Sequence, residues 1–280
     1  MTLIQALVLG LVQGLTEFLP VSSSGHLVLA RELLGAQTHG IVFEVMVHFA
    51  TMVAIIVVFR RRLWWILSRL GSREDEGRSA RRLILYIIIG TIPAGMAGLF
   101  LDDLVERAFQ STLLVSLALA ATGGILWLTR FAPGGRGSVR ADRSVGENRS
   151  SAAERSVGVY GAWAIGCAQA LALLPGISRA GWTIAAGLLL GVDAEEAVEF
   201  SFLLALPAIA GATAKELLSA QGEGLGLFNP VAVSAGMPVA FLSGWLALLF
   251  LVRIVRRGKL ARFAFYCWAV ALLGFVVAVR

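Results

Sequence analysis

Residues 13–26 read Gln-Gly-Leu-Thr-Glu-Phe-Leu-Pro-Val-Ser-Ser-Ser-Gly-His, and this stretch decides how the chain is organised. It places a carboxylate, three consecutive hydroxyls and an imidazole beside Pro and Gly, in otherwise apolar sequence. Ionisable groups inside a membrane are costly and usually mark a transport pathway or a reaction centre. We therefore expect the rest of the chain to hold this stretch at membrane depth, facing a second polar stretch around Arg179.

The composition is that of an integral membrane protein. The chain has 280 residues, of which 58% are hydrophobic and 15% charged, with a mean hydropathy of +0.80. Soluble domains carry about 25% charged residues. The net charge of +6 comes from arginine clusters that membrane topology explains, which argues against nucleic acid as a partner. Cys167 and Cys267 lie in apolar segments, so packing is expected of them rather than a disulfide or a metal.

The first 34 residues are predicted to form a re-entrant helical hairpin over residues 3–34. An apolar helix over 3–19 ends before Pro20, and a second helix from His26 is too short to cross a bilayer. Irregular backbone at membrane depth is tolerated only where protein buries it or water reaches it. Gly10 and Gly14 form a G-x-x-x-G pair, which favours close packing against another helix.

Six spanning helices complete the predicted fold. They are expected over residues 42–59, 83–101 and 113–128 in the first half and over 197–215, 230–252 and 263–279 in the second. A second re-entrant hairpin is expected over 159–190, where Pro175 and Gly176 break an apolar run. The polar stretch 132–157 is predicted to be a flexible cytoplasmic linker between the halves 1–131 and 158–280.

The distribution of basic residues predicts the orientation. Nineteen of the 24 Lys and Arg residues fall in three segments read as loops, 60–82, 130–157 and 253–262. Cytoplasmic loops carry the excess of positive charge. This places the three loops in the cytoplasm and both termini outside, and it makes the two hairpins enter from opposite faces.

The two halves also match one another in sequence. At a constant offset of 156 residues, Gln13 aligns with Gln169, Leu15 with Leu171, Ser22 with Ser178, and Gly25 with Gly181. The predicted fold is therefore an all-α polytopic membrane protein with an inverted-topology repeat, each half being one re-entrant hairpin plus three transmembrane helices. Such repeats place the functional site near the midplane, where broken helices meet.

The side chains at the two hairpin tips indicate phosphate chemistry. The first tip supplies Glu17, Ser22, Ser23, Ser24 and His26, and the second supplies Ser178, Arg179 and Thr183. An arginine fork suits phosphate, and helix N-termini bind anions. A serine beside a histidine is the pairing for nucleophilic attack with a general base. Glu17 would orient His26 or help to hold a divalent cation.

Each feature also has a structural interpretation. The serine run after Pro20 is also what a helix cap looks like, and Glu17 is also suited to structural hydrogen bonding. Arg179 would in that case only pair with Glu17 across the repeat. Glu44 and His48, four residues apart, either line the cavity or form a local hydrogen-bonded pair.

The sequence resembles the undecaprenyl-diphosphatase family, the membrane enzymes associated with bacitracin resistance. The resemblance rests on residues 13–26, on Phe43-Glu44, on Leu-Pro-Gly-Ile-Ser-Arg-Ala-Gly-Trp-Thr over 174–183 and on Glu-Phe-Ser-Phe-Leu-Leu over 199–204. It implies removal of the terminal phosphate of undecaprenyl diphosphate at the outer face of the bacterial inner membrane, which recycles the lipid carrier for cell-wall synthesis. It also implies two re-entrant hairpins and six spanning helices.

The resemblance implies roles for individual residues as well. It makes Ser23 the nucleophile, His26 the acid/base, Glu17 a carboxylate near any Mg²⁺ or Ca²⁺, and Arg179 the phosphate clamp. The expected phosphate-binding residues beside them are Gln13, Ser22, Ser24, Ser178 and Thr183.

Four residues depart from the family pattern and affect these expectations. Gln13 stands where a glutamate is usual, which weakens a mechanism with two metal-binding carboxylates. His48 stands where glutamine is common. Ala180 and Trp182 make the second tip bulkier.

Two further questions stay open at the level of sequence. A lipid-phosphate transporter or flippase would need a similar phosphate site, although binding alone does not require a nucleophile and a base. The small-residue spacing of Gly187 and Gly191 suits internal packing or a homodimer equally well.

Overall fold

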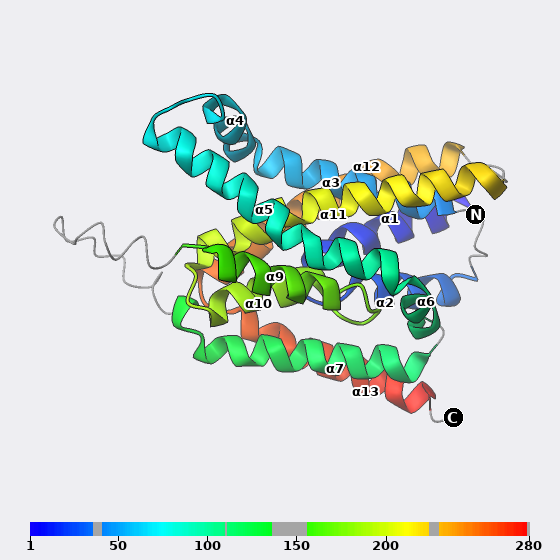
Figure 1. The fold of residues 1–280 in the computed structure, drawn as a ribbon. Coiled ribbons are helices and arrows are strands. Elements are labelled where there is room, and N and C mark those ends of the chain that lie inside the picture. The colour runs from blue at the N-terminus through cyan, green and yellow to red at the C-terminus, as the bar shows by residue number, and fades with distance from the viewer. Residues whose placement is uncertain (36–40, 110, 136–155, 224–229, 279–280) are drawn as a thin grey trace.

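The computed structural model describes residues 1–35, 41–109, 111–135, 156–223 and 230–278. These residues form α-helices joined by turns and short 3₁₀ segments, with no strand among them (Figure 1). The predicted all-α class is therefore confirmed for this part of the chain. Most of the predicted linker, residues 136–155, lies outside the described residues.

Two short apolar helices are broken where the sequence predicted. α1 (Leu3–Phe18) is followed by α2 (Ser23–Leu33), and α9 (Val159–Leu171) by α10 (Arg179–Leu189). With 16 and 13 residues, α1 and α9 fall short of the ~20 residues that a bilayer requires. α2 begins at Ser23 rather than at His26, so Ser23 and Ser24 lie in its first turn.

Each break contains a residue in the left-handed region. Ser22 has φ 68° between α1 and α2, and Gly176 has φ 92° between α9 and α10. A β-carbon disfavours this conformation, so glycine adopts it freely and serine does so at a cost. Non-glycine residues held this way are found where function constrains the backbone. Ser22 therefore marks the first break as a site under constraint.

Six further helices surround the broken pairs. They are α3 (Ile41–Val58), α5 (Asp75–Phe100), α7 (Thr112–Leu128), α11 (Ala194–Glu223), α12 (Pro230–Arg256) and α13 (Phe263–Ala278). In the described part of the chain, five helical segments are long and apolar enough to cross a membrane. A sixth is counted when α3 and α4 (Arg60–Arg69), bent by 70°, are taken as one span.

Glycines allow the first broken helix to lie close against its neighbour. α1 packs along α12, while α9 packs along α5 and α7 along α13 (Figure 1). A β-carbon on Gly10 would come within 2.4 Å of the Gly236 carbonyl oxygen, and one on Gly14 within 2.0 Å of Ser243 Oγ. The close packing predicted from the G-x-x-x-G pair is confirmed, and its partner is α12.

The expectation of a loop over residues 60–82 is wrong. α4 occupies Arg60–Arg69, and α5 begins at Asp75 rather than at residue 83. Acidic residues in a first turn stabilise the helix N-terminus, and Glu76 also pairs with Arg69 at 3.0 Å. The high charge predicted a loop, although two helices separated by a short turn at residues 70–74 occupy this segment. A further helix, α6 (Asp102–Phe109), was not predicted.

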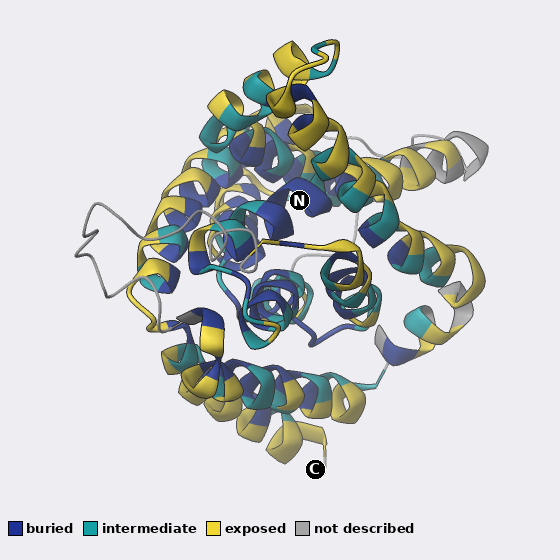
Figure 2. Ribbon diagram, turned by 60° about the vertical axis from the view of Figure 1, so that its left-hand side comes forward, coloured by how far each residue is buried: buried dark blue, intermediate teal, exposed yellow. Residues whose placement is uncertain are grey.

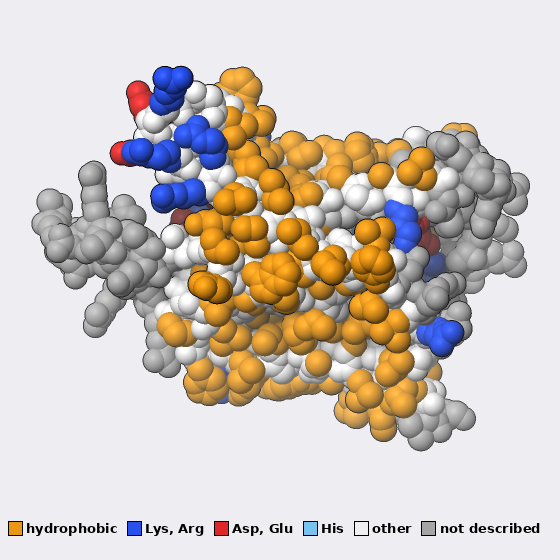
Figure 3. Space-filling model, in the orientation of Figure 1, with side chains coloured by type: hydrophobic (Ala, Val, Ile, Leu, Met, Phe, Trp, Pro, Cys, Tyr) orange, Lys and Arg blue, Asp and Glu red, His pale blue; other side chains and the backbone are white. Residues whose placement is uncertain are grey.

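The outer surface suits a lipid environment. Buried residues gather on the central helices, and exposed residues lie on the outer ones (Figure 2). A broad band of apolar side chains covers the face in Figure 3, and arginines gather beyond it over α4 and the start of α5. α13 ends at the end of the molecule where α1 begins (Figure 1). Both cysteines are free, and Cys267 is buried, as packing residues should be.

Candidate active site

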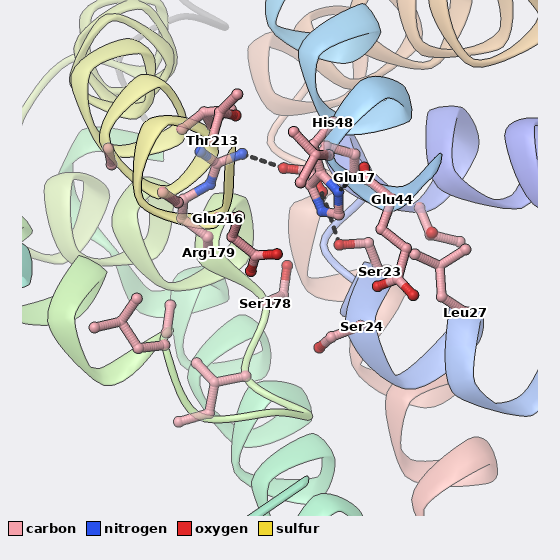
Figure 4. Close-up of a pocket in the computed structure, with 18 of the residues that line it drawn as sticks. Glu17, Ser23, Ser24, Leu27, Glu44, His48, Ser178, Arg179, Thr213 and Glu216 are labelled. Atoms are coloured by element: carbon pink, nitrogen blue, oxygen red, sulfur yellow. Dashed lines mark hydrogen bonds and ion pairs between the residues drawn. The ribbon is translucent and has the colours of Figure 1, made fainter. Parts of the chain in front are cut away.

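A cavity of about 440 Å³ lies where the two breaks meet. Its walls come from α1, α2 and α3 on one side and from α9, α10 and α11 on the other. In Figure 4, Arg179 and Glu17 point toward each other across this space, with Ser23 and His48 beside Glu17. The two polar stretches singled out in the sequence therefore face one another, as predicted.

Glu17 is the centre of the polar network. Its carboxylate accepts a hydrogen bond of 2.7 Å from Ser23 Oγ and one of 3.1 Å from Gln13 Nε2. The Arg179 guanidinium forms an ion pair with its other oxygen. The Glu17 side chain is only 7% exposed, so the pairing is shielded from bulk water. A buried carboxylate needs such partners, and here they come from both tips.

The second tip is held in place by α7. Ser178 caps α10, accepting a hydrogen bond from the Gly181 N–H at 3.2 Å. Thr122 of α7 donates to the Gly176 carbonyl at 3.1 Å and accepts from the Ser178 N–H at 3.2 Å. Trp182 Nε1 donates to the same Thr122 hydroxyl at 3.2 Å. The bulky Trp182 side chain of the second tip is thus oriented by its hydrogen bond to Thr122.

The N-termini of α2 and α10, the second helices of the two broken pairs, lie at the cavity. Ser23 and Ser24 in the first turn of α2, and Ser178 and Arg179 at the start of α10, all line it. The first N–H groups of a helix have no partner within the helix, and together with the helix dipole they favour an anion. The cavity is suited to a phosphate group near Ser23 and Arg179.

The structure does not form the expected Ser23–His26 pair. His26 Nδ1 lies 2.8 Å from the Ser22 carbonyl oxygen, and its Nε2 lies 2.7 Å from the Tyr266 hydroxyl. Because α2 starts at Ser23, His26 is three residues further along and points toward α13. The imidazole on the cavity wall is that of His48, whose Nε2 lies 3.8 Å from Glu17 Oε2.

The expected phosphate-binding residues divide into two groups. Ser24 and Ser178 line the cavity. Gln13, Ser22 and Thr183 are buried and support it from behind. Thr183 donates to the Arg179 carbonyl at 2.7 Å and contacts the Ser201 hydroxyl. Gln13 reaches the cavity only through Glu17.

Several lining residues were not predicted as site residues. They are Arg31, Glu44, His48, Gln169, Thr213 and Glu216. For Glu44 and His48, the sequence left two interpretations open, and the structure contains both: the two residues line the cavity, and His48 Nδ1 lies 2.8 Å from the Glu44 carbonyl oxygen. Gln169 had a signal in the sequence, since it is the repeat partner of Gln13. The polar residues of α11 had none, because Thr213 lies within the segment predicted to span the membrane and Glu216 lies just beyond it.

Gln169 predicts an unusual result for stability. It is 2% exposed, and neither Nε2 nor Oε1 has a hydrogen-bond partner among the described residues. A buried amide without partners costs about 1–3 kcal/mol, so Gln169→Met should leave Tm unchanged or raise it. The matched residue Gln13 has one unpartnered atom, Oε1, but its Nε2 donates to Glu17, so Gln13→Met removes that bond and should lower Tm. A fall of more than about 3 °C for Gln169→Met, roughly 1 kcal/mol in a chain of this size, would show that the amide is satisfied.

Metal binding by the protein alone has little support in the described residues. They contain no group of three or more His, Cys, Asp or Glu side chains arranged to hold an ion. Mg²⁺ is commonly held by one or two carboxylates together with substrate phosphates and water. Glu17 could serve as such a carboxylate together with substrate phosphates, but it does not belong to a metal site built from the described protein side chains alone.

The fold is that of a multi-pass membrane protein with a polar cavity where two broken helices meet. The chain belongs to the family of the bacitracin resistance protein BacA, whose family model matches residues 6–273. A relative from Desulfosudis oleivorans, named undecaprenyl-diphosphatase, is 42% identical over 95% of this chain and 94% of its own. Relatives of the same name from Desulforapulum autotrophicum and Syntrophotalea carbinolica are each 39% identical over 99% of this chain, and over 98% and 100% of their own lengths.

Proposed function

We infer that this protein is an undecaprenyl-diphosphate phosphatase, a hydrolase that releases orthophosphate from the lipid diphosphate. Membership of the BacA family and the names of its relatives support the activity. The convergence of Ser23 and Arg179 on the buried carboxylate of Glu17 is the observation that supports the site. The product, undecaprenyl phosphate, is the carrier that cell-wall synthesis reuses, and its recycling confers bacitracin resistance.

The geometry supports Ser23 as the nucleophile and Glu17 as its base. Ser23 Oγ already donates its hydrogen to Glu17 Oε2 at 2.7 Å, which is within the reach that proton transfer needs. Attack by Oγ on the terminal phosphorus forms a phosphoserine and breaks the bond to the bridging oxygen. The bridging oxygen leaves with the lipid phosphate. Glu17 first passes the proton that it received from Ser23 to His48. Water then cleaves the phosphoserine, giving orthophosphate, while Glu17 takes a proton from the water and returns it to Ser23 Oγ as the phosphorus–oxygen bond breaks.

Arg179 and the two helix N-termini would stabilise the charge that spreads over the equatorial oxygens. To do so, the guanidinium turns from Glu17 onto the phosphate. Direct attack by water, with Ser23 only binding phosphate, is the main variant of this mechanism.

We propose different roles for the two histidines. His26, held between the Ser22 carbonyl and Tyr266, is a positioning residue that supports the first break. His48, beside Glu17 and on the cavity wall, is placed to take up the proton that Glu17 receives. This replaces the acid/base role that the resemblance implied for His26.

We also propose the inverted repeat and the re-entrant hairpins. The interhelix contacts support them, because α1 packs on α12 of the other half while α9 packs on α5. The 156-residue offset supports them independently. With the arginine-rich segments in the cytoplasm, both termini face the periplasm, and the site opens to the outer face of the inner membrane. The boundaries of the halves, 1–131 and 158–280, follow from the same repeat.

A homodimer remains a prediction. Gly187 does not provide a surface for it, because a β-carbon there would lie 3.0 Å from the Ala197 side chain of the same chain. The lipid substrate and the bilayer are the partners that the family and the apolar helices support.

The activity is tested by phosphate release from undecaprenyl diphosphate by the purified protein in detergent. Steady release is expected, and a chelator should reduce it if Mg²⁺ or Ca²⁺ enters with the diphosphate and meets Glu17. Transport of the intact lipid without release would instead favour the flippase alternative. Full activity in chelator would remove the metal from the proposal but leave the phosphatase in place.

A further inference from the structure

The cavity holds a second arginine–glutamate pair, which the reaction above does not use. Arg31 of α2 and Glu44 of α3 form an ion pair, and both line the same cavity as Arg179 and Glu17. On α2, the lining residues Ser23, Leu27 and Arg31 recur every fourth position. Residues at this spacing share one face of a helix, so Ser23 and Arg31 face the same space.

The two pairs lie at different depths. The side chain of Glu17 is 7% exposed, and that of Glu44 is 39% exposed. Glu44 lies near Leu27 in Figure 4, on the same side of the cavity as Ser23. Eight residues along a helix correspond to about 12 Å, and long side chains lean toward the helix N-terminus. Arg31 therefore lies about two turns from Ser23 on the same face of α2, paired with the more exposed carboxylate of Glu44.

We propose that Arg31 is a second anion site, which binds the lipid-linked phosphate of the substrate while Arg179 binds the terminal phosphate. This inference rests on the proposed phosphatase function. A diphosphate ester presents two phosphoryl groups, and a guanidinium fork binds either of them. With the terminal phosphorus at Ser23, the second group lies on the side of the open end, where the lipid chain leaves.

The position of Arg31 also gives it a role in the chemistry. When the bond to the bridging oxygen breaks, negative charge develops on the lipid-linked phosphate. A cation aimed at developing charge stabilises the transition state more than the ground state. Glu44 holds Arg31 at the cavity wall until the phosphate takes its place, as Glu17 holds Arg179.

The alternative is an ion pair that only fastens α2 to α3. The two interpretations differ for ligands with one and with two phosphoryl groups. Dissociation constants of methylenediphosphonate, which is not hydrolysed, and of orthophosphate are measured by ³¹P NMR titration of the full chain in a non-ionic detergent. Arg31→Gln should weaken diphosphonate binding about 10- to 100-fold, the value of a hydrogen-bonded charge. Orthophosphate binding should stay within about twofold.

Two control variants make the test decisive. Arg31→Lys keeps the charge and should recover part of the diphosphonate affinity. Arg107→Gln, at an exposed arginine of α6 outside the cavity, should change neither constant. Equal losses for both ligands, or no loss for the diphosphonate, would overturn the second site. Because binding is measured without turnover, a wild-type protein that binds both ligands but releases no phosphate would count against the proposed function alone.

Discussion

Arg179→Met is expected to lower kcat/KM for undecaprenyl diphosphate by about 10³-fold. The guanidinium is the cation that faces Ser23 and Glu17 across the cavity, and cations and donors aimed at a transferring phosphoryl group typically contribute factors of this size. The value of kcat/KM is measured from phosphate release by the purified variant. Arg179→Lys keeps the charge but loses the planar fork of the guanidinium, so its kcat/KM should lie between that of Arg179→Met and that of the wild type.

The same substitution needs a control for folding. Without Arg179, the buried Glu17 carboxylate lacks its counter-charge, and breaking such a pair costs about 3–5 kcal/mol. The double variant Glu17→Gln/Arg179→Met removes that unpaired charge, so it should recover stability but not activity. Elution volume and Tm are measured beside turnover. A folded Arg179→Met protein with near-normal phosphate release would contradict the anion-clamp role.

Ser23→Ala is expected to lower kcat by about 10⁴-fold or more, and Glu17→Gln by about 10²- to 10⁴-fold. Their effects should not add, because nucleophile and base act as a unit and the loss of either disables the same step. Ser24→Ala provides the comparison, since it removes a neighbouring hydroxyl that bonds to Ser22 rather than to Glu17. The kcat of Ser24→Ala should fall by less than about tenfold, which corresponds to the loss of one neutral hydrogen bond.

The covalent step has its own observable. Acid quenching during turnover, followed by mass spectrometry, should find phosphate on Ser23. If Ser23→Ala keeps within tenfold of wild-type activity, direct attack by water replaces the phosphoserine route, and Ser23 is reduced to binding phosphate.

Much of the fold could be predicted because a bilayer imposes strong constraints on sequence. Apolar length, the breaks at Pro20 and Pro175, and the 156-residue offset each carried information about the helices. The arginine-rich segment 60–82 was misread, because charge excludes a segment from the membrane but does not prevent it from being helical. α4 and the start of α5 form there with their own ion pairs.

The candidate site was predicted in composition more than in geometry. Glu17, Ser23, Ser178 and Arg179 meet as expected, because both tips carry their signal in a contiguous motif. Sequence proximity favoured a pair between Ser23 and His26, but the structure places the His26 ring between the Ser22 carbonyl and Tyr266 and the His48 ring beside Glu17. His48 joins the cavity through the packing of α3 against α1, a contact between distant parts of the sequence. Arg31 shares the face of α2 that carries Ser23 and Leu27, a spacing that the sequence contains but that was not used to predict the site.

The central claim is that Ser23 and Arg179 act on one phosphoryl group. It is tested most directly by an experimental structure with orthovanadate, a mimic of the phosphoryl transition state that should bind tightly where that state is stabilised. We expect vanadium bonded to Ser23 Oγ, with the Arg179 guanidinium moved from Glu17 onto the vanadate oxygens. Vanadate bound elsewhere, such as beside His26 and Tyr266, with the Glu17–Arg179 pair intact, would contradict it.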